Sequence, residues 1–234
     1  MKLLKNITYD IQAIKKYGLF THLKYLFDYN HVIVILQAHT DFVPPFEPNS
    51  LFEIKEVDYT DAVVLQEWAD IVNEAFGFAN PYDVNSAKSN LTEHSYRKIE
   101  NLYFVYYKDD PNPAGTIFIG TSRNNSKLGI FGRIAVRKKF QKHGLGKYLV
   151  LWGFEKFREK GIKLTEDVAY FKRDYTLRLW IRCGAIPQFN RNYMNFKPTP
   201  KFFLTRLWVQ KEVKKIYADF LIGLRKPYIF PVNK

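Results

Sequence analysis

The chain has 234 residues, 47% of them hydrophobic, and a formal net charge of +13. This hydrophobic share is enough for a real core and argues against intrinsic disorder. The single cysteine, Cys183, excludes an internal disulfide and a multi-cysteine zinc site. The longest apolar run, Val32–Leu36, is too short to span a bilayer, and no signal-peptide core follows Met1. We expect a cytoplasmic location and anionic partners: a phosphorylated cofactor, nucleic acid or acidic lipid.

The first 48 residues are predicted to form an extension ahead of the main domain. Apolar residues recur at helical spacing over residues 1 to about 29 in a basic context, and the β-branched residues of His31–Ala38 predict a strand. Pro44–Pro48 is typical of a stiff, extended linker. We therefore predict an extension over 1–48, a main domain over 49–198 and a C-terminal helix and tail over 199–234.

The C-terminal part, Phe202–Leu224, combines apolar residues at helical spacing with many basic ones, which predicts an amphipathic helix. Its apolar face is expected to pack on the domain or on the N-terminal helix. The alternative is a surface for an acidic membrane or a partner.

The main domain alternates between strands and helices. Strands are predicted at Leu51–Val57, Leu102–Tyr107, Gly115–Thr121, Ile130–Val136, Lys163–Tyr170 and within Ile186–Phe196. Helices are predicted from a cap at Asp58 or Thr60 to Phe76, and over Val84–Tyr96, Leu145–Lys160 and Tyr175–Arg182. The inward face of the first helix would carry Val64, Leu65, Trp68, Ile71, Val72 and Ala75. This order predicts a mixed α/β sheet.

A basic turn with two glycines joins the strand ending at Val136 to the helix starting near Leu145. Gln141, Gly144 and Gly146 mark this turn. Glycines at such a junction let the backbone approach a ligand closely, and the free N–H groups of the helix start favour an anion, best a phosphate. The turn is not a P-loop, because Lys147 is followed by a tyrosine and not by Ser or Thr, nor a dinucleotide fingerprint, because the third glycine is missing.

The spacing Gln-x-x-Gly-x-Gly, with Val136 five residues before Gln141, resembles motif A of the GNAT acyltransferase superfamily. The element order over about residues 51–197 is similar to that of the same family. The resemblance implies a GNAT-like α/β fold, with a mixed, mostly antiparallel central sheet flanked by helices. The N-terminal helix, strand and proline linker resemble uncharacterised bacterial members.

The resemblance also implies an acyl-coenzyme A co-substrate, most simply acetyl-coenzyme A, and no metal. Backbone groups of Ile134, Ala135 and Val136 would bond the pantetheine arm and the thioester. The backbone of the turn would hold the pyrophosphate through Gln141, Lys142, His143, Gly144, Leu145, Gly146 and Lys147. Arg173, which replaces an asparagine of a second family signature, is a candidate contact for the cofactor's phosphates.

The same second signature leaves the catalytic acid and base open. Leu179 and Gly184 match it, but Trp180 replaces the tyrosine that is the family's usual general acid, and an indole N–H cannot protonate a thiolate. Tyr175 is the candidate substitute. Glu166 is the first candidate base, with Asp167 and Glu74 as alternatives.

Three functions follow as hypotheses. The first is an acyl-coenzyme A-dependent N-acyltransferase that acts on a small amine. The second is a nucleic-acid or ribonucleoprotein modifying enzyme on the same fold, suggested by the basic charge and the aromatic residues. The third is a non-catalytic acyl-coenzyme A-binding or membrane-associated module, suggested by Trp180 and the basic ends. The residues name neither the acceptor nor the oligomeric state.

Overall fold

The computed structural model describes residues 33–77, 81–108, 110–170 and 174–188, and residues 211, 213–215 and 217–218. The predicted N-terminal helix lies outside these residues. Of the predicted C-terminal helix, the described residues are helical and Val213 is buried. The chain divides into two compact units. We call the unit formed by Leu36–Asp167 and Leu179–Ile186 the main unit.

The described strands form a seven-stranded sheet in the order β2-β3-β4-β5-β6-β1-β7. Their bounds are β1 Ile33–His39, β2 Phe52–Val57, β3 Arg97–Tyr107, β4 Pro113–Ser122, β5 Asn125–Val136, β6 Leu164–Tyr170 and β7 Ile186–Pro187. Strands β2 to β5 pair antiparallel, whereas β5 and β6 pair parallel. The sheet is therefore mixed and mostly antiparallel, as predicted.

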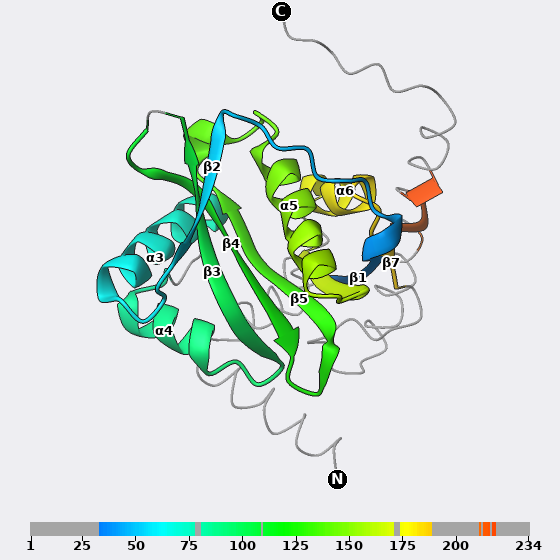
Figure 1. The fold of residues 1–234 in the computed structure, drawn as a ribbon, viewed down its shortest axis with the longest axis horizontal. Coiled ribbons are helices and arrows are strands. Elements are labelled where there is room, and N and C mark those ends of the chain that lie inside the picture. The colour runs from blue at the N-terminus through cyan, green and yellow to red at the C-terminus, as the bar shows by residue number, and fades with distance from the viewer. Residues whose placement is uncertain are drawn as a thin grey trace, which may run out of the picture. The chain divides into compact units, whose positions relative to one another are not determined.

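Helices α3 and α4 cover one face of the central strands and α5 covers the other (Figure 1). The helices are α3 Ala62–Phe76, α4 Val84–Thr92, α5 Leu145–Glu159 and α6 Asp174–Arg182, with 3-10 turns η2 Thr40–Phe42 and η3 Lys138–Phe140. Asp61, and not the predicted Asp58 or Thr60, caps α3 by accepting a hydrogen bond from the Val63 N–H. The Asp58 carboxylate instead accepts from Thr60 in the preceding turn, which brings Asp61 to the helix start.

The core between α3, α4 and the sheet is built from apolar side chains at the predicted helical spacing. Its buried members from α3 are Leu65, Trp68, Ala69, Ile71 and Val72, while Val64 and Ala75 are partly buried against them. On the opposite face, Phe131 of β5 meets Phe154 and Phe157 of α5 edge-on, with ring centroids 4.9 and 4.8 Å apart. Both faces of β5 are thus fixed by packing.

Several element bounds differ from the sequence predictions. The helix predicted to reach Tyr96 ends at Thr92, and β3 begins at Arg97 rather than Leu102. The reason is sheet pairing, because Arg97 lies opposite Ser122 of β4. Strand β1, predicted within the extension, belongs to the sheet. The domain boundaries at 48 and 198 stay predictions. No helix in the described part of the chain combines the length and apolarity that crossing a bilayer requires.

Strand β5 contains a bulge just before the predicted thioester-binding residues. Gly132 lies opposite Phe118, and Ala135 lies opposite Thr116, so β5 has one residue more than β4 in this interval. Arg133 takes up the extra length with a φ of 47°, a left-handed conformation that bulges usually give to glycine. Because a non-glycine residue in this conformation costs about 1–2 kcal/mol, the surrounding packing must impose it.

Gly132 is required beside this bulge, because the Phe118 ring occupies the place of its missing side chain. A Cβ at position 132 would lie 1.7 Å from the Phe118 Cζ. Gly132→Ala should therefore lower the free energy of unfolding by about 1–3 kcal/mol, measured by chemical denaturation. Ser126→Ala, at an exposed position of the same strand, should change it by less than about 0.5 kcal/mol. Equal stability of the two variants would contradict the packing described here.

Candidate active site

The turn between β5 and α5 contains one side-chain hydrogen bond to the strand and two residues with left-handed backbone conformations. The Gln141 Nε2 donates a hydrogen bond to the Val136 carbonyl, 2.9 Å away, which ties the turn back to the strand. Lys142 and Gly144 have φ angles of 68° and 84°. Gly144 is the N-cap of α5, and no side chain caps the helix. The first N–H groups of α5 are therefore available to an anion.

Two carboxylates of α3 fix the start of this turn. The Arg137 guanidinium donates to Glu67 and to Glu74, the latter at 2.7 Å, and the Lys138 N–H donates to Glu74 at 2.7 Å. Burial opposes ionisation of Glu74, but these hydrogen bonds and the charge of Arg137 outweigh it and lower its pKa. Glu74, an alternative base in the sequence analysis, is thus an ionised carboxylate whose hydrogen bonds to Arg137 and Lys138 stabilise the turn.

Aromatic rings support the same turn from the β2 side. Phe140 stacks on Tyr107 with centroids 5.7 Å apart, and Tyr107 meets Phe52 edge-on at 5.7 Å. Phe52 and Phe46 both contact Tyr148 in the first turns of α5, at 4.9 and 5.0 Å. This aromatic cluster joins the proline-rich segment, the sheet and the helix start, so the turn is held at both of its ends.

At the residues where the family resemblance places the thioester, strand β5 pairs with a described neighbouring strand on one of its two edges and not on the other. Its parallel ladder with β6 ends, among the described residues, at Ile130 opposite Glu166. On its other edge, Ala135 and Val136 still pair with Thr116 and Gly115 of β4. Backbone groups of β5 beyond the ladder can therefore bond a ligand that lies alongside the strand.

Glu166, the first candidate base, lies where that ladder ends. Its side chain is buried, with 6% exposure. One carboxylate oxygen accepts from the Tyr96 hydroxyl at 2.6 Å, and the other accepts from the Gln37 Nε2 at 2.8 Å. Both donors are neutral and orient the carboxylate. Neither donor was identified from the sequence, because Gln37 and Tyr96 come from segments far from Glu166 in the chain.

The residues proposed for the acid and for a phosphate contact are placed differently. Tyr175 lies in the first turn of α6 and is 67% exposed, so its role stays a prediction. Arg173 lies outside the described residues. Trp180 is 3% exposed and meets Phe131 edge-on at 5.0 Å, so its indole is part of the core between β5 and α5.

Cys183 is fully buried, and burial raises the pKa of its thiol to about 12, which makes it a poor nucleophile. His, Cys, Asp and Glu side chains of the described residues form no group of three or more that could hold a metal ion. His143 is an exposed residue of the turn.

A polar network that the sequence did not reveal extends from the bulge. The Arg133 Nη2 donates to the Tyr82 hydroxyl at 2.8 Å, and the Asn90 Nδ2 donates to the same hydroxyl at 3.2 Å. The Asn90 Oδ1 in turn accepts from the Arg97 Nη2 at 2.9 Å. The network joins β5, the segment before α4, α4 itself and the start of β3. Only the long-range pairing of these elements brings the residues together.

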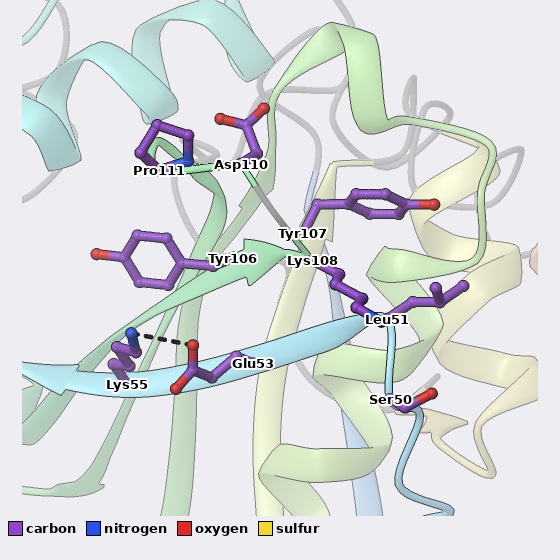
Figure 2. Close-up of a pocket in the computed structure, with 9 residues that line it drawn as sticks. All are labelled: Ser50, Leu51, Glu53, Lys55, Tyr106, Tyr107, Lys108, Asp110 and Pro111. Atoms are coloured by element: carbon purple, nitrogen blue, oxygen red, sulfur yellow. Dashed lines mark ion pairs between the residues drawn. The ribbon is translucent and has the colours of Figure 1, made fainter.

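A shallow hollow lies on the outer edge of the sheet, away from this network. Figure 2 shows its lining: Ser50, Leu51, Glu53, Lys55, Tyr106, Tyr107, Lys108, Asp110 and Pro111. Glu53 and Lys55 pair with each other at 2.9 Å. Asp110 pairs with Lys139 of the turn at 2.8 Å, so the hollow borders the turn without including its glycines. Its lining contains neither Glu166 nor the β5 backbone.

The Glu74 contacts generate a prediction. Glu74→Gln should lower the free energy of unfolding at pH 7 by about 1–2 kcal/mol, because Arg137 loses a charged partner. The folded pKa of Glu74 lies below its ordinary 4.5, so the extra stability is complete above pH 4.5. It disappears as the pH falls through the folded pKa. Melting temperatures from pH 7 to 3 should therefore converge for the two proteins.

The matched control for this prediction is Glu53→Gln, which removes one of two exposed, paired side chains of β2. Surface pairs of this kind contribute little, so its melting temperature should follow that of the unchanged protein at every pH. A Glu74→Gln deficit that stays constant down to pH 3 would show that the carboxylate charge does not hold the turn.

Comparison with known proteins places this geometry in context. The sequence profile of the Acetyltransferase (GNAT) family matches residues 65–185, which is 121 of the 234 residues. Among curated proteins no match is found. A GCN5-related N-acetyltransferase from Sphaerobacter thermophilus superposes with a TM-score of 0.52 at 18% identity, over 72% of this chain and 52% of the other.

Two further solved structures are similar at lower scores. A GCN5-related N-acetyltransferase from Kribbella flavida has a TM-score of 0.44 at 15% identity, over 73% of this chain and 60% of its own. An aminoglycoside acetyltransferase from an uncultured soil metagenomic sample has a TM-score of 0.47 at 18% identity, over 64% of this chain and 100% of its own. This chain thus spans little more than half the length of the Sphaerobacter and Kribbella proteins. With a profile match over more than half of its length and a mostly antiparallel sheet with helices on both faces, the chain belongs to the GNAT family of acetyltransferases.

Proposed function

We propose that the protein transfers an acetyl group from acetyl-coenzyme A to the nitrogen of an amine acceptor. The observation that supports this proposal best is the pairing of two features at the end of β5. One is the helix start without a side-chain cap at Gly144, and the other is the one-sided backbone of Ile134–Val136. The first suits a pyrophosphate and the second suits an extended pantetheine arm with its amide groups.

The residues present fit the co-substrate. Lys142 and Gly144 have left-handed φ angles, and left-handed residues within a turn are typical of backbone concavities that bind phosphate. A Cβ at Gly144 would meet nothing within 4 Å, and one at Gly146 would meet only the Leu179 side chain at 3.4 Å, so the helix start is open. Residues 141–147 would hold the phosphates. When bound, acetyl-coenzyme A supplies an activated acyl thioester.

Within this proposal, Glu166 takes the proton that the acceptor nitrogen releases as the new bond forms. Its carboxylate is buried, and Tyr96 and Gln37 fix its orientation, which is what a general base requires. N–H groups of the β5 backbone polarise the carbonyl under attack, as donors placed in advance do in acyl transfer. Tyr175 is the proposed source of a proton for the leaving thiolate.

The helix start yields the next prediction. Gly146→Asp should weaken binding of acetyl-coenzyme A at least tenfold more than Gly146→Asn, measured by isothermal titration calorimetry, because it sets a negative charge against the pyrophosphate. An acidic residue in the first turn favours helix formation, so loss of folding would not explain the result. Equal affinity of the two variants would show that the phosphates bind elsewhere.

Glu166 yields a separate prediction. Glu166→Gln should lower kcat by about 10²–10⁴-fold, while calorimetry should still detect acetyl-coenzyme A binding. Tyr96→Phe keeps the carboxylate but removes one of its hydrogen bonds, so it should lower kcat by a smaller factor and alter the pH–rate profile. A Glu166→Gln enzyme with near-normal kcat would assign the base to another group.

A further inference from the structure

Arg97 is a partly buried cation whose described partners are all neutral. Its Nη2 donates to the Asn90 side chain at 2.9 Å and to the Asn90 carbonyl at 3.3 Å. Its guanidinium carbon lies 4.6 Å from the centroid of the Phe118 ring. The Nε is buried and has no acceptor in the described part of the chain. A buried charge normally has a hydrogen-bonded counter-ion, and here the described residues supply none within ion-pair distance.

A second guanidinium belongs to the same network. Arg133 lies on the β5 bulge, and its Nη2 reaches Asn90 through the Tyr82 hydroxyl. Its side chain also lies over the Tyr82 ring, with the guanidinium carbon 5.6 Å from the centroid. The strained backbone of Arg133 gives this position a cost that a purely structural strand residue would not require. Arg133 lies two residues before Ala135, and at Ala135 strand β5 pairs on one edge only.

Burial and the charges of the two arginines lower the pKa values of neighbouring basic groups. Burial lowers the pKa of Arg97 to about 10, and the charge of Arg133 adds to this effect, while Asp167 opposes it. The pKa of His94 is lowered first by burial and then by the charges of Arg97, Arg133 and Arg123. The positive charge around Arg97 and His94 favours an anionic group in this part of the main unit.

We propose that the acetyl acceptor carries a carboxylate as well as the reacting amine, and that Arg97 and Arg133 bind this carboxylate. This inference rests on the proposed function and adds the substrate class to it. In Arg97 the Nη2 is already held by Asn90 and the guanidinium lies against the Phe118 ring, so the donor oriented in advance is the Nε–H, which has no acceptor among the described residues. It would donate to one carboxylate oxygen, and Arg133 is the proposed donor to the other.

The position of this carboxylate site also fits the chemistry. Tyr96, which immediately precedes Arg97, orients Glu166. Glu166 lies opposite Ile130 in the ladder, and Arg133 follows on the same strand β5. An acceptor held by its carboxylate at Arg97 therefore has the proposed base and the free edge of β5 on neighbouring segments of the main unit. Positioning through the far end of a substrate is a common way to place a reacting amine.

The test uses the full chain, acetyl-coenzyme A and matched pairs of amines. One series contains ω-amino acids of two to six carbons, and the other contains the carboxamide of each acid. Release of the coenzyme A thiol is followed with a thiol reagent, and the product is confirmed by mass. At least one acid should exceed its own carboxamide in kcat/KM by tenfold or more, mainly through a lower KM.

Substitutions then assign the preference to Arg97. Arg97→Gln should reduce the acid-to-carboxamide ratio of kcat/KM at least tenfold. Arg97→Lys keeps the charge but not the fixed Nε–H donor, so it should lose most of the ratio while remaining folded. Arg123→Gln removes the same charge from a nearby exposed residue whose described hydrogen bonds go to backbone carbonyls, so it should leave the ratio unchanged.

The outcomes separate the two proposals. Transfer to amines without any preference for the acid would overturn the carboxylate site and leave the acetyltransferase function standing. The same holds if Arg123→Gln reduces the ratio as much as Arg97→Gln, because the effect would then be general charge attraction. Transfer to no amine of either series, with acetyl-coenzyme A bound, would contradict the proposed function and this inference with it.

Discussion

The extra residue of strand β5 at Arg133 is the constraint on which the site depends. The bulge moves Ala135 and Val136 into register with Thr116 and Gly115, and Arg133 itself extends to Tyr82. The left-handed backbone is unfavourable by itself, so packing must compensate for it. The Phe118 ring over Gly132 and the aromatic contacts of Phe131 supply that packing on the two faces of the strand. The core therefore stabilises the irregular segment of β5 that precedes the predicted thioester-binding residues.

The sequence predicted the parts of this arrangement that are encoded locally. Glycine spacing, the basic turn and the apolar face of α5 all lie within a few turns of Gln141, and the observed turn from Val136 to Leu145 agrees with them. The bulge, the buried position of Glu166 and the Arg97 network depend on which strands pair and in what register. Periodicity in a short window carries no information on such pairing. The early start of β3 has the same cause, because Arg97 joins the strand only through Ser122.

The carboxylates show why residue type alone did not assign roles. Glu166 was the first candidate base, with Asp167 and Glu74 as alternatives, on the strength of acidic residue type and place in the sequence alone. Glu74 accepts hydrogen bonds from a cation and a backbone N–H, which lower its pKa and stabilise its ionised form. Glu166 has neutral described donors, so gaining a proton does not break an ion pair with them. Asp167 acts on Arg97 through its charge. The structure thus separates an anchoring carboxylate, a proposed base and a partial counter-charge.

The adjacency of Tyr96 and Arg97 links the proposed base to the proposed carboxylate site. Tyr96 orients the proposed base, whereas Arg97, the next residue, marks the proposed carboxylate site. Their shared backbone is fixed by the pairing of Arg97 with Ser122 and by the Arg123 N–H, which donates to the Tyr96 carbonyl at 3.0 Å. A substitution that shifts this backbone would move the base and the carboxylate site together. Under this proposal, acceptor choice would change without loss of the base through the Arg97 side chain or its neighbours Asn90 and Tyr82, whereas a change in the strand that holds them would affect both.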